Sequence, residues 1–269
     1  MKAILNIGIE TTENSDLKSF LLINKSLLEK NGYYISKAIN IEGHQGLLSF
    51  LSYWDKKKDD HLKQEFVSLP SHIHTVILTN ENFHSIPLTK IEDIKQSLND
   101  LFTKIEITCY ISSQQSLCTS SYSTLLKKGS SISFIENFNK CSPSNNIYQY
   151  YNRLQRWNHL FNKSVFKVRL STPRFLYKNN LVDDFAHALN PELYEQFNTS
   201  FNNRTLCHTG QLLLRILNIV THSKELNRVA VINLYKEIIL GFSNGKGQTL
   251  KPKMIREINK NFKFINEKE

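Results

Sequence analysis

Polar side chains follow several of the apolar, strand-like segments of this chain. Glu81 closes the segment HTVILTNE (His74–Glu81), and Glu42 and His44 come directly after the segment YYISKAI (Tyr33–Ile39). A carboxylate or an imidazole that lies close to a hydroxyl can take its proton, so these three side chains are candidate general bases. A charge that closes a buried strand lies in the ligand crevice of an α/β sheet, which favours a catalytic role for Glu81. For Glu42 and His44, an exposed polar turn explains the residues equally well.

A second candidate site is the stretch ILNIGIETTENSDLKSFL (Ile4–Leu21), which has the pattern of a buried strand, a tight loop and a helix. Loops of this kind hold phosphate groups, because backbone N–H groups and a helix N-terminus face the anion. The stretch lacks the glycine-rich run and the lysine that such a loop normally carries, and Glu13 adds a carboxylate. Two negative charges about 4 Å apart repel by about 1 kcal/mol in water and about 4 kcal/mol near a protein surface.

The composition is that of an ordinary globular chain of 269 residues, with 40% hydrophobic and 22% charged residues. The formal net charge of +10 favours anionic ligands such as nucleotides or acidic sugars, although a lysine-rich solvated surface explains it equally well. The sequence has no nucleic-acid-binding signature, so we expect no nucleic-acid partner. The four cysteines have no CxxC spacing, which predicts neither a zinc site nor a disulfide framework.

The hydrophobic segments of the chain are short. None of them is long and apolar enough to span a membrane. The apolar run near the N-terminus, Ala3–Ile9, is followed by Glu10 and Glu13, which argues against a secretory signal. We therefore expect a cytoplasmic protein without a membrane span.

Strand-like and helical segments alternate through the first two thirds of the chain. Strands separated by helices imply right-handed crossovers and a parallel sheet with helices on both faces. The sequence therefore predicts one α/β domain over residues 1–269, with a central parallel sheet of about five strands and a helical C-terminal part from about residue 174. The predicted strands are Lys2–Gly8, Tyr33–Ile39, His74–Glu81, Lys104–Ile111 and Ser164–Leu170.

Helical spacing of apolar residues predicts the helices, and the turn residues Asn31 and Gly32 end the first of them. The segment Gly129–Asn146, rich in Ser and Asn, is predicted to be a mobile loop. The clearest predicted helices are Ser15–Lys30, Lys90–Phe102, Gln114–Lys127, Gln211–Ile219, Arg228–Leu240 and Pro252–Phe264. The aromatic side chains predicted to pack in the core rather than on a ligand are those of Tyr110, Tyr122, Trp157 and Phe161.

Eight stretches of the chain carry a further signal in their order. They are NIGIETTENSDL, INIEGHQGL, ILTNENF, CYISSQQSLCTSSYSTLLKKG, YYNRLQRWNHLF, VFKVRL, LVDDF and NNRTLCHTGQLLLRILN. No stretch is specific alone. Taken together, from Ile4 to about Asn266, they resemble the bacterial sulfotransferase-like P-loop family that is associated with surface polysaccharides. The resemblance implies a three-layer P-loop fold.

The resemblance also implies a donor, 3′-phosphoadenosine 5′-phosphosulfate, which the family holds in the loop after the first strand without a metal. The lysine that the family keeps in this loop falls on Thr11 here, and a following glycine falls on Glu13. Gly8, Thr12 and Ser15 remain as matching positions for donor binding. Loss of the lysine removes a charge-assisted hydrogen-bond donor from the loop.

Further residues are placed on the donor or the reaction by the resemblance. The family arginine that holds the 3′-phosphate falls on Ser112, whereas Ser120 matches the family serine at the same phosphate. Arg169, in FKVRL, matches the arginine of the family's V-R strand. Lys246, in SNGKGQ, lies in a glycine-bracketed loop of the kind that closes over the nucleotide in sulfotransferases. Glu81 matches the family glutamate that ends the third strand.

The function that the resemblance implies is transfer of a sulfuryl group to a hydroxyl of a bacterial surface polysaccharide or glycolipid. The expected partners are an anionic or hydroxyl-bearing glycan acceptor and proteins of polysaccharide assembly. The joint replacements at Thr11, Glu13, Ser112 and Ser113 favour an alternative, a sulfotransferase fold that has lost transfer activity and binds a glycan or a protein partner. A third hypothesis is a transferase that uses a less anionic donor. Fold resemblance alone does not decide among the three.

Overall fold

The computed structural model describes residues 1–8, 12–36, 65–79, 83, 86–200, 206–223, 235 and 245–266, and of 12–15, 222–223 and 264–266 it describes the backbone alone. The chain divides into two compact units. The first comprises Met1–Ile111 and Tyr150–Phe201, and the second comprises Ser112–Gln149 and Asn202–Glu269. The single domain expected over residues 1–269 stays a prediction.

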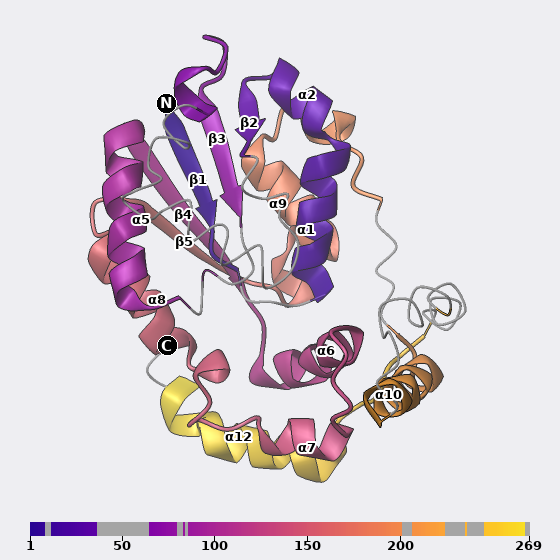
Figure 1. Ribbon diagram of the computed structural model, residues 1–269. Coiled ribbons are helices and arrows are strands. Elements are labelled where there is room, and N and C mark those ends of the chain that lie inside the picture. Colours follow the sequence, from indigo (N-terminus) through magenta and orange to yellow (C-terminus); the bar gives the residue numbers. More distant parts are fainter. Residues whose placement is uncertain are drawn as a thin grey trace. The chain divides into compact units, whose positions relative to one another are not determined.

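The first unit contains a five-stranded sheet in the order β2-β3-β1-β4-β5, and every strand is parallel to its neighbours (Figure 1). This arrangement confirms the predicted α/β class with a central parallel sheet. A strand is present at each of the five predicted positions, although residues 37–39 and 80–81 lie outside the part of the chain that the structure describes. The strands are β1 (Lys2–Asn6), β2 (Tyr33–Ile35), β3 (Thr75–Thr79), β4 (Lys104–Ile111) and β5 (Val165–Leu170).

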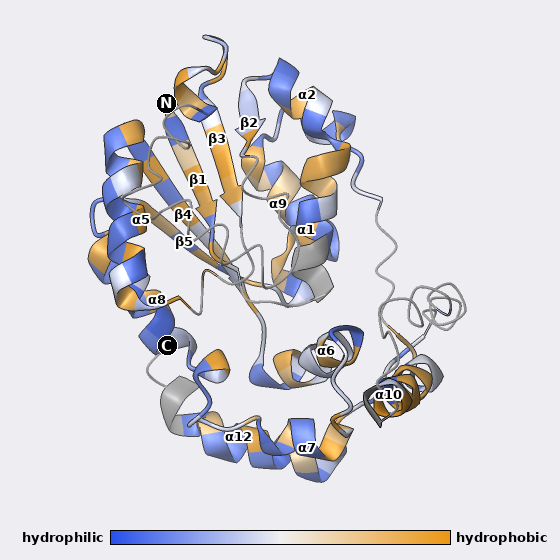
Figure 2. Ribbon diagram, viewed as in Figure 1, coloured by the Kyte–Doolittle hydropathy of each residue, from blue (hydrophilic) through white to orange (hydrophobic). Residues whose placement is uncertain are grey.

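Helices cover both faces of this sheet. On one face, alternate side chains of β1, β3 and β4 pack in a core with α5 (Leu88–Leu101) and α8 (Tyr150–Leu160). On the other face, the strands pack with α1 (Thr12–Ile23), α2 (Lys25–Lys30) and α9 (Leu181–Leu189). A central strand covered on both faces is apolar at successive positions rather than at alternate ones, as Figure 2 shows for β3.

The helix predicted over Ser15–Lys30 is two helices, α1 and α2, separated at Asn24. The Asn24 amide donates to the carbonyl oxygens of Phe20 and Asn198, both at 2.9 Å, and its Oδ1 accepts from the Asn198 N–H at 2.9 Å. Short amide side chains compete with the helix for backbone hydrogen bonds. The break comes from a contact between residues far apart in the sequence, which helical spacing does not report.

The predicted end of α2 at Asn31 and Gly32 is confirmed. Asn31 is the C-cap residue, and Gly32 has a φ of +81°, in the left-handed region. A Cβ atom on Gly32 would collide with the ring of His74 and lie 2.9 Å from the His72 carbonyl oxygen. Glycine is therefore required here both by the backbone and by the space, so that the chain can enter β2 directly.

The second unit is helical where it is described, and it confirms the predicted helices at 114–127, 211–219 and 252–264. Gln211 joins two of its segments, because its Nε2 donates to Ser123 Oγ (2.7 Å) and its Oε1 accepts from the Gln248 N–H (2.7 Å). The predicted helix over 228–240 lies outside the described residues except for Tyr235. The helices are α6 (Gln114–Lys127), α7 (Phe134–Asn139), α10 (His208–Ser223) and α12 (Pro252–Asn266).

The prediction of a mobile loop over Gly129–Asn146 is wrong, because the segment contains α7. A capping box begins this helix: Ser133 Oγ accepts from the Glu136 N–H (3.2 Å), and Glu136 Oε2 accepts from the Ser133 N–H (2.7 Å). The Asn137 amide then donates to the Cys118 carbonyl oxygen at 2.8 Å. The Ser and Asn residues that suggested disorder are the groups that cap and anchor the helix.

Glu106 of β4 links three neighbouring strands through charge. Its carboxylate lies 2.7 Å from Lys167 Nζ of β5 and 3.0 Å from Lys2 Nζ of β1, and its side chain is 11% exposed. Burial by itself would raise the pKa of this carboxyl, but the hydrogen bonds and charges of Lys167 and Lys2 lower the pKa below its ordinary value of 4.5. A carboxyl with a lowered folded-state pKa stabilises the fold above its unfolded-state pKa.

We therefore expect the Glu106 contribution to be fully present above pH 4.5 and to disappear as the pH falls through the lower folded-state pKa. Glu106→Gln should reduce the free energy of unfolding by about 2 kcal/mol at neutral pH and flatten its fall in acid. Urea unfolding across this pH range measures both effects. The control is Glu92→Gln, at an exposed position of α5. Equal acid sensitivity of the Glu106→Gln variant and the parent chain would contradict the prediction.

Candidate functional site

The topology of the first unit places a ligand crevice between the carboxyl ends of β1 and β4. From β1 the chain proceeds toward β2 at one edge of the sheet, and from β4 it proceeds to β5 at the other edge. Ligands of open α/β sheets bind at such a point, where the chain connections of two adjacent strands leave in opposite directions. The Ile7 N–H, just after β1, donates to the Thr108 carbonyl oxygen of β4 at 2.9 Å, which keeps the two strand ends together.

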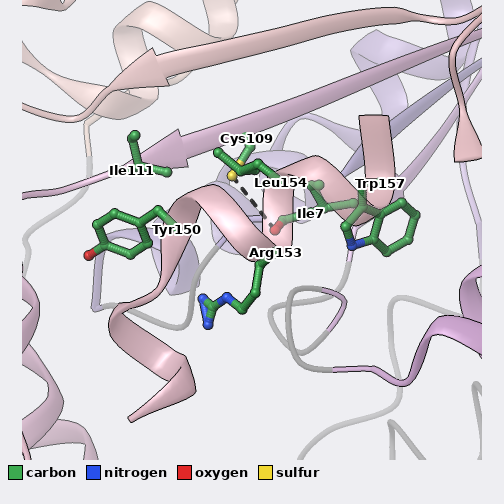
Figure 3. Close-up of a pocket in the computed structure, with 7 residues that line it drawn as sticks. All are labelled: Ile7, Cys109, Ile111, Tyr150, Arg153, Leu154 and Trp157. Carbon is green, nitrogen blue, oxygen red and sulfur yellow. Dashed lines mark hydrogen bonds between the residues drawn. The ribbon is translucent and has the colours of Figure 1, made fainter. Parts of the chain in front are cut away.

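A small pocket lies at this point of the sheet (Figure 3). The sheet contributes an apolar floor, since Ile7 follows β1 and both Cys109 and Ile111 belong to β4. The Cys109 thiol donates to the Ile7 carbonyl oxygen at 3.8 Å, and burial raises the pKa of this thiol to about 12. Cys109 is therefore a neutral thiol at physiological pH. The residues of α8 that line the pocket are Tyr150, Arg153, Leu154 and Trp157.

Among the described residues that line the pocket, Arg153 alone carries a formal charge, and it is buried. Its relative exposure is 7%, and neither Nε nor Nη2 has a hydrogen-bond partner among the described residues. Burial lowers the pKa of its guanidinium to about 10, so the group is still protonated at neutral pH. Arginine is almost never fully buried in proteins without a partner.

Helix geometry explains why Arg153 faces inward. Tyr150, Arg153 and Trp157 have the spacing i, i+3 and i+7, and all three side chains of this face are buried. The remaining residues of the helix include Arg156, which is exposed. Sequence reasoning noted the stretch YYNRLQRWNHLF but not the charge within its buried face. The signal was present, because an arginine between two aromatic residues at helical spacing belongs to the face that packs.

Asn6 anchors the start of the loop after β1. Its Oδ1 accepts from the Gly8 N–H at 3.2 Å, and its Nδ2 donates to Thr79 Oγ1 at the end of β3, also at 3.2 Å. Asn6 is 2% exposed. The Gly8 N–H is therefore already hydrogen-bonded to a side chain of its own segment. Helix α1 begins four residues later, at Thr12. Sequence analysis did not single out Asn6, although it is the polar residue that ends an otherwise apolar strand.

Arg169 of β5 is bound to a carboxylate of its own chain. Its Nε lies 2.9 Å from Asp184 Oδ2 and its Nη2 lies 3.0 Å from Asp184 Oδ1, an edge-on pairing through two hydrogen bonds. Asp184 also accepts from the Tyr110 hydroxyl (2.8 Å) and from the Tyr177 N–H (2.9 Å). Burial, and then the Asp184 carboxylate, raise the pKa of Tyr110. The arginine of the V-R strand thus meets the acidic residue of LVDDF, and its assignment to a cofactor stays a prediction.

The other residues singled out from sequence are distributed as follows. Glu42, His44, Glu81 and Thr11 lie outside the described residues, and of Thr12 and Ser15 only the backbone is described. Gly8, Thr12 and Ser15 belong to the first unit, and Ser112, Ser120 and Lys246 belong to the second. The Ser120 hydroxyl donates to the Leu117 carbonyl oxygen (3.3 Å), and the Lys246 carbonyl oxygen accepts from the His208 N–H (3.2 Å). Ser112 directly follows β4 and is half-buried, whereas the Lys246 side chain is exposed.

The described residues contain no group of three or more His, Cys, Asp or Glu side chains that could hold a metal ion. Within the same residues, no helix has the length and apolarity to cross a membrane. Tyr110, Tyr122, Trp157 and Phe161, predicted to be core residues, are all buried.

Comparisons with known proteins give a weak structural likeness. No protein-family model matches the chain, and no curated protein matches it. Among solved structures, the crystal structure of a sulfotransferase from Alicyclobacillus acidocaldarius is similar at 13% sequence identity and a TM-score of 0.49, covering 97% of this chain and 91% of that chain. A likeness of this size carries no argument about activity.

Proposed function

We propose that the protein is a sulfotransferase-family protein that transfers a sulfuryl group from 3′-phosphoadenosine 5′-phosphosulfate to a hydroxyl of a bacterial surface polysaccharide or glycolipid. One observation carries most of the proposal. β1, which ends two residues before Gly8, is the central strand of an all-parallel sheet and pairs with β4, and α1 begins at Thr12. A loop in this place is where an α/β sheet holds an anionic ligand.

A second observation supports the ordered motifs of the resemblance. The V-R strand and the LVDDF stretch, 15 residues apart at Arg169 and Asp184, form an ion pair in the first unit. Two motifs that were matched only by their order along the chain are thus in contact. This contact gives them a shared structural role in joining β5 to α9.

The proposed reaction needs a base, a loop for the phosphosulfate and a site for the 3′-phosphate. Glu81 comes two residues after β3 in the sequence and would take the proton of the acceptor hydroxyl, with Glu42 and His44 as the alternatives. The acceptor oxygen would then bond the sulfur while the bond from sulfur to the phosphate oxygen breaks. Gly8, Thr12, Ser15, Ser112 and Ser120 are the donor-binding positions that the resemblance supplies, with Lys246 in the loop over the nucleotide and Arg169 in the V-R strand.

These donor-binding residues fit the donor in hydrogen bonding and not in charge. The loop after β1 has Thr11 and Glu13 where the family has lysine and glycine, and Ser112 stands for an arginine. The same replacements favour the alternative function, a sulfotransferase fold without transfer activity that binds a glycan or a protein of polysaccharide assembly. A working donor site needs positive charge from another part of the chain.

Calorimetric titration with 3′-phosphoadenosine 5′-phosphate, the product of the donor, tests the proposal. We expect micromolar binding by the natural chain, and at least tenfold tighter binding by the double variant Thr11→Lys, Glu13→Gly, because it restores a cation and removes a carboxylate. The control is Asn99→Lys, Glu92→Gln, which makes the same change of net charge at exposed positions of α5. Its affinity should stay within about threefold of the natural chain.

Each outcome of the titration has a definite meaning. Binding by the double variant alone would favour the alternative, a donor site that has lapsed. An equal gain in the control variant would show that net charge rather than the loop determines affinity. Absence of binding by all three proteins would contradict a sulfotransferase donor site at this loop.

A further inference from the structure

Arg153 is a buried charge that the proposed reaction does not use. Its side chain belongs to the inward face of α8, the residue is 7% exposed, and its Nε and Nη2 atoms are buried. Arg169 of β5, whose side chain is 38% exposed, is by contrast neutralised by Asp184. Among the residues that the structure describes, no carboxylate lines the Arg153 pocket. A protonated guanidinium in such surroundings favours an anion beside it.

The free atoms of Arg153 are the two that bind oxyanions edge-on. Nε and Nη2 form one edge of the guanidinium, and both lack a hydrogen-bond partner among the residues that the structure describes. Arg169 uses the same two atoms to hold both oxygens of Asp184. Two parallel N–H groups at this spacing match two oxygens of a phosphate, sulfate or carboxylate.

The position of the pocket also points to a ligand. Its walls are Ile7, which follows β1, and Cys109 and Ile111 of β4, with α8 on the other side (Figure 3). The pocket thus lies beside the carboxyl ends of β1 and β4, the two strands whose chain connections diverge. Gly8 and the loop to α1 come next in the chain after Ile7. A cation here is at the strand end from which the expected phosphate loop leaves.

We propose that the Arg153 guanidinium is the cation of an oxyanion site at the carboxyl ends of β1 and β4, and that it holds a phosphate or sulfate ester group. On the proposed function, this group is the phosphosulfate of the donor, so Arg153 supplies the charge that Thr11 does not. The identity of that ligand rests on the proposed function, whereas the oxyanion site rests on the pocket itself.

Two probes and three variants test the site. The probes are inorganic pyrophosphate and 3′-phosphoadenosine 5′-phosphate, added at constant ionic strength, and the measurements are thermal unfolding and calorimetry. Arg153→Met keeps an unbranched apolar side chain and removes the charge. Arg153→Lys keeps the charge but removes the planar guanidinium with its two parallel N–H donors. The matched control is Arg156→Met, at an exposed position of the same helix.

We expect pyrophosphate to raise the melting temperature of the natural chain and of Arg156→Met by several degrees. Arg153→Met should lose this response and melt, without ligand, at the same temperature as the natural chain or above it, because an unpaired buried charge has been removed. Arg153→Lys should bind pyrophosphate at least tenfold more weakly. If Arg153→Met fails to fold, the Arg153→Lys comparison decides.

Two results would overturn the inference. One is an unchanged pyrophosphate response in the Arg153 variants. The other is an Arg153→Met chain that melts many degrees lower while keeping the response, which would mean that the guanidinium pairs with a carboxylate of its own chain. Failure of the proposed function looks different: pyrophosphate would bind through Arg153, whereas the nucleotide would not bind at all. If the nucleotide binds equally well to the natural chain and to Arg153→Met, the proposed function stands, but Arg153 does not contribute to donor binding.

Discussion

Asp184→Ala should lower the free energy of unfolding by about 3 kcal/mol, although the residue carries no expected role in catalysis. Asp184 is 2% exposed and accepts four hydrogen bonds, from Arg169 Nε and Nη2, the Tyr110 hydroxyl and the Tyr177 N–H. Alanine leaves all four donors without their acceptor. Arg169 recovers part of the loss from water, because 38% of its side chain is exposed, but the buried Tyr110 hydroxyl does not.

Urea unfolding of the variant measures this loss. The control is Asp93→Ala, which removes a carboxylate from a surface pair with Lys90 (3.2 Å) and should cost less than about 1 kcal/mol. The combination of Asp184→Ala with Arg169→Met should cost less than the sum of the single changes, because both remove the same pair. Additive costs, or an Asp184→Ala cost as small as that of the control, would refute the network as a stabilising unit.

Trp157→Ala should lower the free energy of unfolding by about 4 kcal/mol, which is the largest effect that we expect from a single substitution. Trp157 is 1% exposed and belongs to the core between the sheet and α8. Its ring stacks on Phe161 with centroids 5.6 Å apart and meets the edge of Phe83 at 6.0 Å. Alanine removes both ring contacts and leaves a cavity next to the Arg153 pocket.

Chemical denaturation of Trp157→Ala, Trp157→Phe and Phe175→Ala distinguishes the loss of core packing from the mere removal of an aromatic ring. Trp157→Phe keeps an aromatic ring and should recover about half of the loss, since the remaining cavity is smaller. Phe175→Ala removes a ring that is 52% exposed and contacts Arg174, and it should cost less than about 1 kcal/mol. A Trp157→Ala cost in the range of the Phe175 control would mean that Trp157 does not hold α8 against the sheet.

Most of the described elements of this protein could be predicted from local patterns, although α8 was not among the predicted helices. Short apolar runs marked all five strands, and apolar spacing marked α5, α6, α10 and α12. The errors have identifiable causes. The break at Asn24 depends on hydrogen bonds to Asn198, and the helix inside the segment 129–146 depends on a capping box and on the contact from Asn137 to Cys118. Neither cause is visible in the spacing of apolar residues.

The candidate site could be predicted only in its location. The pattern of alternating strands and helices predicted a crevice at the carboxyl ends of the strands, and the structure puts the Arg153 pocket there. The roles of Glu42, His44 and Glu81 stay predictions, because these residues lie outside those that the structure describes. Arg169 was chosen as a cation for the donor, and the structure pairs it with Asp184.

The sequence by itself determined the α/β fold class of this protein. The spacing of apolar residues is a local property, and each strand or helix shows it independently of its neighbours. It also determined that the loop after β1 lacks positive charge, since the residue types alone decide that. Only the tertiary structure decided which charges are neutralised. Arg153 and Arg169 look alike in the sequence, but Arg169 pairs with Asp184, whereas Arg153 lines a pocket to which the described part of the chain contributes no carboxylate. The pairing of a buried charge depends on residues that are distant along the chain, and no local pattern records it.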